Sequence, residues 1–561
     1  MLSLMFRRLG MLICAVWIGA SALRAQKPPS AELGQLSFPT SQSGPAQAAF
    51  VRGVLYLHNF EYDEAILAFR QAQQLAPGFA MAYWGEALSY SQPLWYSENL
   101  VRAREVLARL APTPVARAAK APTAREKGYL EAIELLFGPG ERLARFRACA
   151  DRLATLSAQF PADDEARLFQ GLALLGTIPE GARKPDVSLK AGGLAATVLA
   201  KNPRHPGAAH YMLHAYDDGE HNQMALGAAR IYATIAPASS HALHMPSHAF
   251  LPLGMWDEAA RSDEASFAAS VAWVARTGRT INQQDFHSLS WLHYEYLQQG
   301  RFANARDAAA LVKRALDQSG QAPASSGVSN AGGVDHAPGH LTSSEIDRGF
   351  DAAALRNELA NMRVRAIIEG SDWELMKGQR AFDNVDELFA LGLSSVALDD
   401  YARADTAAGE LLKAAARAQA PDMAEVAAIM HEELTGLLAI ARGSRESGLA
   451  ALASASRREA ARPRPIARPY PAKPAGELYA EALFGLGNPQ AAIAQYRRVL
   501  QRTPRRPAAL LGLARAARAA GDRVESVRAA NEFLRIWHAA DADRPELREA
   551  RDLAGLGPRA R

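Results

Sequence analysis

Histidines are the side chains of this sequence with the clearest capacity for chemistry, and they are unevenly distributed. Seven of the 14 histidines lie between His205 and His248. Within this stretch His210 and His214 are four residues apart, and His244 and His248 repeat the pair 34 residues later. Residues four apart lie on one face of a helix about one turn from each other. Each pair can therefore present two imidazoles to the same side.

Paired imidazoles of this kind favour a bound transition metal. Neutral imidazole and carboxylate are ligands that suit zinc, copper, iron and nickel. In a metalloenzyme such an ion polarises a substrate, or activates water or oxygen, at a coordination position that the protein leaves open. We therefore predict a candidate site for zinc, copper or iron, with the ligands His210, His214, His244, His248 and Asp217.

Two other interpretations of the same histidines stay open. They can line a groove that binds a peptide or an acidic partner, or they can cap carbonyls and fill packing positions. Pro246 also interrupts the second pair, and a helix that begins at Ser247 would leave His241 and His244 in a loop. The helical-face argument would then cover only the first pair and His248.

Other motifs are weaker. His221 follows Glu220 in a predicted turn, His336 and His340 form a second pair in a Gly/Ser-rich stretch, and His431 lacks the second histidine of a zincin helix. The sequence has no glycine-rich phosphate loop, no nucleophile elbow and no paired-cysteine zinc motif. Motifs therefore assign no enzyme class.

The elements that must position the histidines follow a repeat, which is clearest at residues 46–79. Small residues at repeat positions 8, 20 and 27 let two antiparallel helices approach closely, large ones at 11 and 24 fill the space between them, and proline at 32 ends the second helix. The residues at these positions are Gly53, Tyr56, Ala65, Phe69, Ala72 and Pro77. The pattern resembles the 34-residue tetratricopeptide repeat.

A second cluster of the same kind lies near the C-terminus. Residues 473–506 carry Gly487, Ala492, Tyr496 and Pro504 at matching positions, and Gly521 repeats Gly487 34 residues later. Between the two ends helical patterns dominate and alternating, strand-like runs are absent. The predicted fold class is all-α, a tetratricopeptide-like solenoid of helical hairpins in a superhelical array, with a flexible internal linker.

The repeat frame also places the histidines. Units that begin at Pro206, Ser240 and Phe286 put histidines at positions 2, 5 and 9 of the first helix. In tetratricopeptide arrays these positions generally face the concave groove, and neighbouring packed helices lie about 8–10 Å apart, so that side chains of adjacent units can converge. We predict a ligand groove lined by His210, His214, His241, His244, His248 and His287.

Composition divides the chain further. Residues 316–344 are rich in Gly, Ser, Ala and Pro, which is typical of a flexible linker, and residues 462–474 hold five prolines and four basic residues, which favours an extended, polyproline-like connector. The expected organisation is a signal peptide at 1–25, an N-terminal and central array at 26–315, the linker at 316–344, degenerate helical repeats at 345–461, the connector at 462–474 and a C-terminal repeat pair at 475–561.

The N-terminus predicts export. Arg7 and Arg8 precede an apolar run, residues 9–20, and small residues follow, which is the layout of a secretory signal peptide. We expect a periplasmic or extracellular protein, with no membrane span in the mature chain because no later window reaches about 20 apolar residues. Removal of the leader leaves Cys149 as the only cysteine, which excludes an internal disulfide.

Length and charge exclude several classes of protein. A chain of 561 residues is longer than a single compact core usually holds, which excludes a single small domain. A content of 49% hydrophobic residues excludes a chain that is disordered throughout. The formal charge of +4 includes three arginines of the leader, so the remaining chain is close to neutral. Such a balance gives no general electrostatic attraction to nucleic acid, and we expect no nucleic-acid partner.

Several segments together resemble a group of exported bacterial tetratricopeptide-repeat proteins. The resemblance rests on LYLHNFEYDEAILAFRQA, AHYMLHAYDDGEH, HALHMPSHAFLPLGMWDEA and KPAGELYAEALFGLGNPQAAIAQYRRVLQRTPRRPAALLGLARAA. It implies an all-helical repeat fold and a location in the bacterial envelope, and it supplies no reaction. Where the group has a histidine before the Glu-Leu pair of the last segment, this chain has Gly476.

Two functional hypotheses follow. The first is an exported scaffold or binding protein whose histidine-lined groove binds a peptide, a protein or a small ligand. The alternative is a metal-dependent enzyme with a zinc, copper or iron ion held by histidine and aspartate in that groove.

Overall fold

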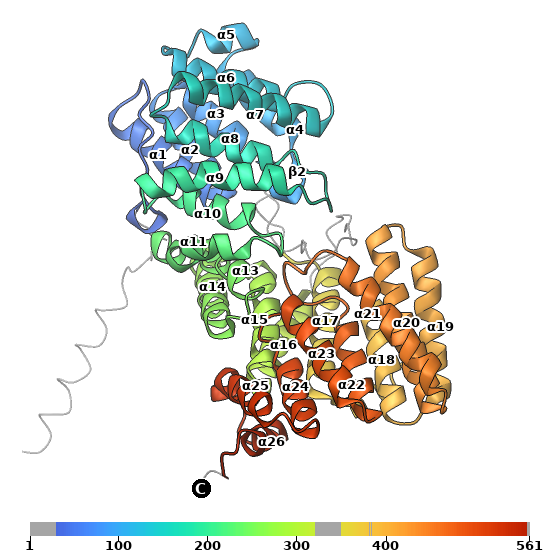
Figure 1. Cartoon of the computed structure of the whole chain (residues 1–561). Helices are drawn as coiled ribbons and strands as arrows, with labels where there is room; N and C mark the ends of the chain where they lie inside the picture. The colour runs from blue at the N-terminus through green and yellow to red at the C-terminus, as the bar shows by residue number, and fades with distance from the viewer. Residues whose placement is uncertain (1–29, 320–348, 381, 383, 558–561) are drawn as a thin grey trace, which may run out of the picture.

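The computed structural model describes residues 30–319, 349–380, 382 and 384–557. Over these residues the regular secondary structure is almost entirely helical, and consecutive helices form antiparallel hairpins that stack on one another (Figure 1). The predicted all-α repeat array is confirmed. None of the helices in the described part of the chain is long and apolar enough to cross a membrane.

The elements fall into three consecutive groups. The N-terminal group is η1 Ser30–Leu33, α1 Gly44–His58, α2 Tyr62–Leu75, α3 Ala80–Leu88, β1 Ser91–Gln92, η2 Pro93–Trp95, β2 Ser97–Glu98, α4 Leu100–Leu110, α5 Pro114–Ala118, α6 Ala124–Leu136, α7 Arg142–Gln159, α8 Asp164–Leu175 and α9 Pro185–Lys201. The central group is α10 Pro206–Ala215, α11 Asn222–Ile235, α12 Ser240–His244, α13 Ser247–Phe250, α14 Trp256–Thr277, η3 Ile281–Gln283, α15 Phe286–Gln298, α16 Phe302–Ser319 and α17 Ala352–Gly370. The C-terminal group is η4 Trp373–Met376, α18 Val385–Ala397, α19 Tyr401–Arg417, α20 Pro421–Ala441, α21 Arg445–Ala461, α22 Ala475–Gly485, α23 Pro489–Arg502, α24 Pro507–Ala519, α25 Arg523–Ile536, η5 Trp537–Ala539 and α26 Pro545–Leu553. The two short strands pair antiparallel, with Ser91 opposite Glu98 and Gln92 opposite Ser97.

The first hairpin shows why small residues recur. The ring of Phe69 on α2 is fully buried and lies against two glycines, Gly53 of α1 and Gly85 of α3. A Cβ atom at Gly53 would lie 2.7 Å from this ring, and one at Gly85 would lie 2.3 Å from it. The close approach of three helices therefore depends on the absence of these two side chains.

We expect Gly85→Ala to destabilise the N-terminal hairpins by about 1–3 kcal/mol, because the added methyl group overpacks the Phe69 contact. The matched control is Gly193→Ala on α9, where a Cβ would meet no atom within 4 Å and the better helix propensity of alanine should stabilise by up to about 1 kcal/mol. Urea unfolding followed by circular dichroism measures both changes, and two shifts of equal sign would contradict the packing argument.

The C-terminal repeats pack back on the centre of the array. The indole Nε1 of Trp537 donates to the carbonyl of Gln298 on α15 (2.9 Å), and Nε1 of Trp256 on α14 donates to the carbonyl of Arg505 (3.0 Å). In Figure 1, α24 and α25 accordingly lie beside α15 and α16 rather than extending the array outward. One continuous apolar core runs from η1 through the central helices to α26. A second apolar core is formed by side chains of the helices from α17 through α22.

The predicted connector at 462–474 is non-helical and joins α21 to α22. It is partly buried: Ala467 and Arg468 are enclosed, and Arg468 donates to the carbonyl of Ser290 on α15. The predicted signal peptide lies outside the described residues, as does most of the predicted linker, whose first residues, 316–319, continue α16.

Candidate metal centre

Three consecutive first helices of the array carry the histidine cluster: α10, the pair α12 and α13, and α15 (Figure 1). Each begins at a side-chain cap that satisfies a backbone N–H of the first turn. The caps are His205 for α10, Ser239 for α12 and Asp285 for α15, which accept from the N–H of Ala208, Ala242 and Ser288, respectively.

Pro246 divides the middle helix in two without turning the chain. Met245 (φ −51°, ψ −32°) and Pro246 (φ −59°, ψ −29°) both keep right-handed helical backbone angles, so α13 continues the direction of α12. His241 and His244 therefore lie on a helix and not in a loop. Nε2 of His244 is 3.0 Å from Nε2 of His248, which keeps the second pair on one face.

The six groove histidines form two groups of three. The first triad is His210, His214 and His241, and the second triad is His244, His248 and His287; within each triad one nitrogen per ring lies within 4.8 Å of the others. In the first triad, Nε2 of His210 lies 2.9 Å from Nε2 of His241 and 3.0 Å from Nε2 of His214.

The triads repeat the same design one unit apart. Each takes the histidines at positions 5 and 9 of one unit and the histidine at position 2 of the next unit. The sequence-based metal set joined His210, His214, His244 and His248 in one site. The structure places these residues in two groups, each completed by a position-2 histidine, and the rings of His214 and His248 adjoin with centroids 6.4 Å apart.

A backbone carbonyl at the end of α1 orients the ring of His210. Its Nδ1 lies 2.6 Å from the backbone carbonyl oxygen of His58, which can only accept, so Nδ1 carries the proton. In the neutral ring Nε2 then presents a single lone pair toward the other two imidazoles. One lone pair cannot accept good hydrogen bonds from two rings at once, whereas a cation at this point can be bound by all three.

Carboxylates orient the second triad in the same way. Asp263 of α14 contacts Nδ1 of His244 at 2.6 Å, and Asp217, in the loop after α10, contacts Nδ1 of His248 at 2.7 Å. Asp217 therefore does not point at the ring nitrogens that converge. Carboxylate–imidazole pairs of this kind fix the tautomer and aim the other nitrogen at a metal. Burial raises the pKa of Asp263, and the neighbouring Glu295 adds to this effect.

We expect Asp217→Ala and Asp263→Ala each to weaken metal binding about 10–100-fold, because each removes the oxygen that accepts from the outer nitrogen of one ligand ring. The matched control is Asp218→Ala, since Asp218 binds His221 outside both triads. Competition against a chromogenic chelator measures the affinities. Equal affinity of the control and the two variants would contradict an orienting role.

Aromatic rings enclose both triads. Phe60 lies against all three rings of the first triad, with a centroid distance of 4.2 Å to His210, and Trp291 lies 4.4 Å from His248 in the second. Trp95 borders His214 and His241. Phe60 has a left-handed backbone (φ 58°), an uncommon conformation for a bulky residue that occurs often at functional sites.

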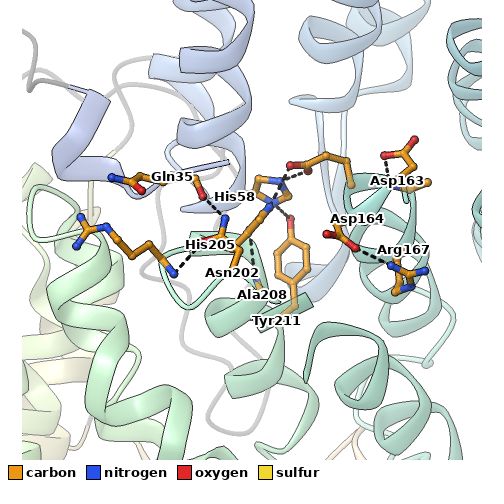
Figure 2. Close-up of polar contacts among 12 residues, drawn as sticks. Gln35, His58, Asp163, Asp164, Arg167, Asn202, His205, Ala208 and Tyr211 are labelled. Carbon is orange, nitrogen blue, oxygen red and sulfur yellow. Dashed lines mark hydrogen bonds and ion pairs between the residues drawn. The ribbon is translucent and has the colours of Figure 1, made fainter. Parts of the chain in front are cut away.

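A third histidine group, with His58, His205 and Glu165, is a closed hydrogen-bond network. Figure 2 shows His58 and His205 of this group beside Tyr211. Nε2 of His58 and of His205 contact the two oxygens of Glu165 at 2.7 and 3.0 Å. Nδ1 of His58 bonds the Tyr211 hydroxyl at 2.9 Å, and Nδ1 of His205 caps α10. Every ring nitrogen and both carboxylate oxygens have a partner, so this group is structural.

We expect the stability of the protein to fall as the solution is acidified, in part through this network. Burial alone would raise the pKa of Glu165, but His58 and His205 lower it to about 2, below its ordinary value of 4.5. The carboxylate therefore stabilises the fold above pH 4.5, and this contribution is lost as the pH falls toward 2. Burial lowers the pKa of His58 below its ordinary value of 6.5. Below pH 6.5 the unfolded chain therefore binds a proton at this residue more readily than the folded chain does, and this lowers the stability further. Urea midpoints between pH 7 and 3 measure this slope, which Glu165→Gln should flatten.

The remaining candidate histidines stand apart from the triads. His221 bonds Asp218 in the turn before α11, and His431 bonds the carbonyl of Ala408. His336 and His340 lie outside the described residues. Asp263, Phe60 and Trp291 are site residues that the sequence did not suggest, and only Trp291, one turn after His287, had a helical spacing that could have pointed to it.

Comparisons with known proteins identify the repeats. Residues 46–79 and residues 475–516 match two family models described as tetratricopeptide repeat. No curated protein matches the sequence. Similar solved structures include the APC/C hetero-tetramer Cut9–Hcn1 (TM-score 0.29, 12% identity, 92% of this chain and 78% of that chain), a human IFIT1 dimer with m7Gppp-AAAA (0.31, 12%, 90% and 92%) and yeast Tom70 (0.29, 12%, 91% and 95%).

Proposed function

Because this chain is a tetratricopeptide-repeat protein with two histidine triads in its central units, we propose that it is an exported scaffold that holds two transition-metal ions in its groove. The observation that carries the proposal is the convergence of ring nitrogens whose opposite sides are fixed by a carbonyl and two carboxylates. This is the arrangement that metal-bound imidazoles require.

The spacing of the nitrogens supports the proposal. Metal–nitrogen bonds of about 2.0–2.1 Å with angles of about 90–109° place ligand nitrogens about 2.9–3.4 Å apart. The Nε2–Nε2 distances of the triads are 2.9 and 3.0 Å in the first and 3.0 Å in the second. Three protein ligands leave a coordination position for water or a substrate, which is the pattern of catalytic rather than structural sites.

The ligand type narrows the choice of metal. All six ligands are imidazole nitrogens, which suit zinc, copper and iron and do not suit magnesium or calcium, since those ions prefer oxygen. Cys149, the only cysteine in the described part of the chain, is buried on α7 within the apolar core, so thiolate ligation does not contribute.

The repeats also support a coarser role. Stacked helical hairpins of this family form extended surfaces that commonly bind protein partners. The proposal joins the two roles: a protein or peptide partner binds the scaffold, and the metal ions supply chemistry to it. Export follows in this proposal from the N-terminal leader pattern of two arginines and an apolar run.

Elemental analysis tests the proposal. The full chain, expressed with its leader and purified from the envelope fraction without a metal-affinity column, should carry about two zinc, copper or iron ions per chain. The same protein stripped with a chelator should take up added metal to the same ratio and unfold at a higher temperature when loaded. A chain that carries no metal and binds none after stripping would refute the metal sites and leave the scaffold.

A further inference from the structure

The two triads lie next to each other. His214 and His248, one from each triad, have ring centroids 6.4 Å apart. Both are only partly buried, whereas the other four ligands are at most 7% exposed. Solvent, and with it a small exogenous ligand, therefore reaches the triads at His214 and His248, where they adjoin.

The surroundings of this opening favour ions of low charge. No carboxylate oxygen belongs to either triad, and Asp217 and Asp263 contact the outer nitrogens of His248 and His244 and not the nitrogens that converge. Two adjacent cations repel in proportion to the product of their charges, so a pair of monovalent ions repels about four times less than a divalent pair. Among the metals that imidazole suits, copper has a stable monovalent state.

From these observations, which rest on the proposed function, we infer that the two triads form one dinuclear copper centre whose substrate is dioxygen. Each Cu(I) ion gives up one electron and becomes Cu(II). Dioxygen takes up both electrons and becomes peroxide, keeping one O–O bond, and the peroxide is held between the two ions. No proton and no further reductant enters this step.

The walls of the site suit this chemistry. Phe60 and Trp95 border the first triad and Trp291 borders the second, so apolar rings restrict water around the ions. The ring positions are set by packed helices on both sides: His210 through the carbonyl of His58, and His244 through Asp263. A site held in this way changes its geometry little when the ions change their oxidation state.

The test uses the full chain stripped of metal and loaded with Cu(I) without oxygen. We expect about two copper ions per chain and, on admission of oxygen, uptake of about one dioxygen per two copper ions. The resulting Cu(II) ions should show little paramagnetic resonance signal, because a bridging ligand couples their spins. His214→Ala and His248→Ala should each bind one copper and take up no dioxygen, whereas His221→Ala, outside both triads, should behave as the unmodified chain.

The possible outcomes distinguish failure of the dinuclear copper centre from failure of the metal sites themselves. Two copper ions that take up no dioxygen, and that after chemical oxidation give the resonance signal of two independent spins, would overturn the dinuclear centre and leave the metal sites intact. Two bound zinc ions with no binding of Cu(I) would have the same meaning. Absence of any bound metal would remove the proposed function together with this inference.

Discussion

His210→Ala is expected to lower the metal content of the purified chain from about two ions to about one, and His244→Ala is expected to remove the other ion. Each of these residues belongs to one triad only, and each is fully buried with its outer nitrogen fixed, so that no other side chain can replace it. The double variant should retain no tightly bound metal. Elemental analysis of dialysed protein, per mole of chain, measures the three values.

The stepwise loss is the informative result. A single site formed by both His-x-x-x-His pairs would hold one ion, and either substitution would abolish its binding. His221→Ala is the control, because His221 is a partly exposed histidine that bonds Asp218 away from both triads. Circular dichroism spectra that match the unmodified chain would show that each variant still folds.

Glu165→Ala is expected to destabilise the protein by about 3–5 kcal/mol, because it leaves the N–H groups of His58 and His205 buried without an acceptor. Glu165 is 1% exposed, and it holds together residues of α1, α8 and the start of α10. Urea unfolding at pH 7 measures the change in free energy.

The neighbouring residue supplies the control for this experiment. Asp164 forms ion pairs with Arg167 and Lys201 at the surface, so Asp164→Ala should cost no more than about 1 kcal/mol. Equal effects of the two substitutions would contradict a structural role of the buried network. Bound metal could also restore the full stability of Glu165→Ala. This result would indicate that the network acts through His210, because the carbonyl of His58 holds the His210 ring.

The fold and the groove histidines were predictable because they depend on local spacing. Gly53, Phe69 and Pro77 mark a helical hairpin within one 34-residue unit, and the same frame places His210 and His241 on first helices. Which histidines share a site depends on something else, the angle at which one unit stacks on the next. This angle brings His241 to the first pair and His287 to the second, and no single unit encodes it.

The supporting residues were less predictable, because they come from distant segments. The carbonyl of His58 contacts a ring 152 positions later in the chain, and Asp263 reaches His244 from the following helix. Asp217 illustrates the same limit. The sequence predicted Asp217 as a ligand of the metal site, but α10 ends at Ala215, and the loop that follows turns the carboxylate toward the outer nitrogen of His248.

The sharing of each triad between two units has a mechanical consequence. An ion bound by His210, His214 and His241 fastens the hairpin of α10 and α11 to α12, and an ion bound by the second triad fastens α12 and α13 to α15. Repeat arrays can unwind one hairpin at a time from their ends, since each hairpin contacts mainly its neighbours. Two metal ions that each link adjacent units would make these three consecutive hairpins unfold only together. The metal-loaded array would therefore resist local unfolding in its central units.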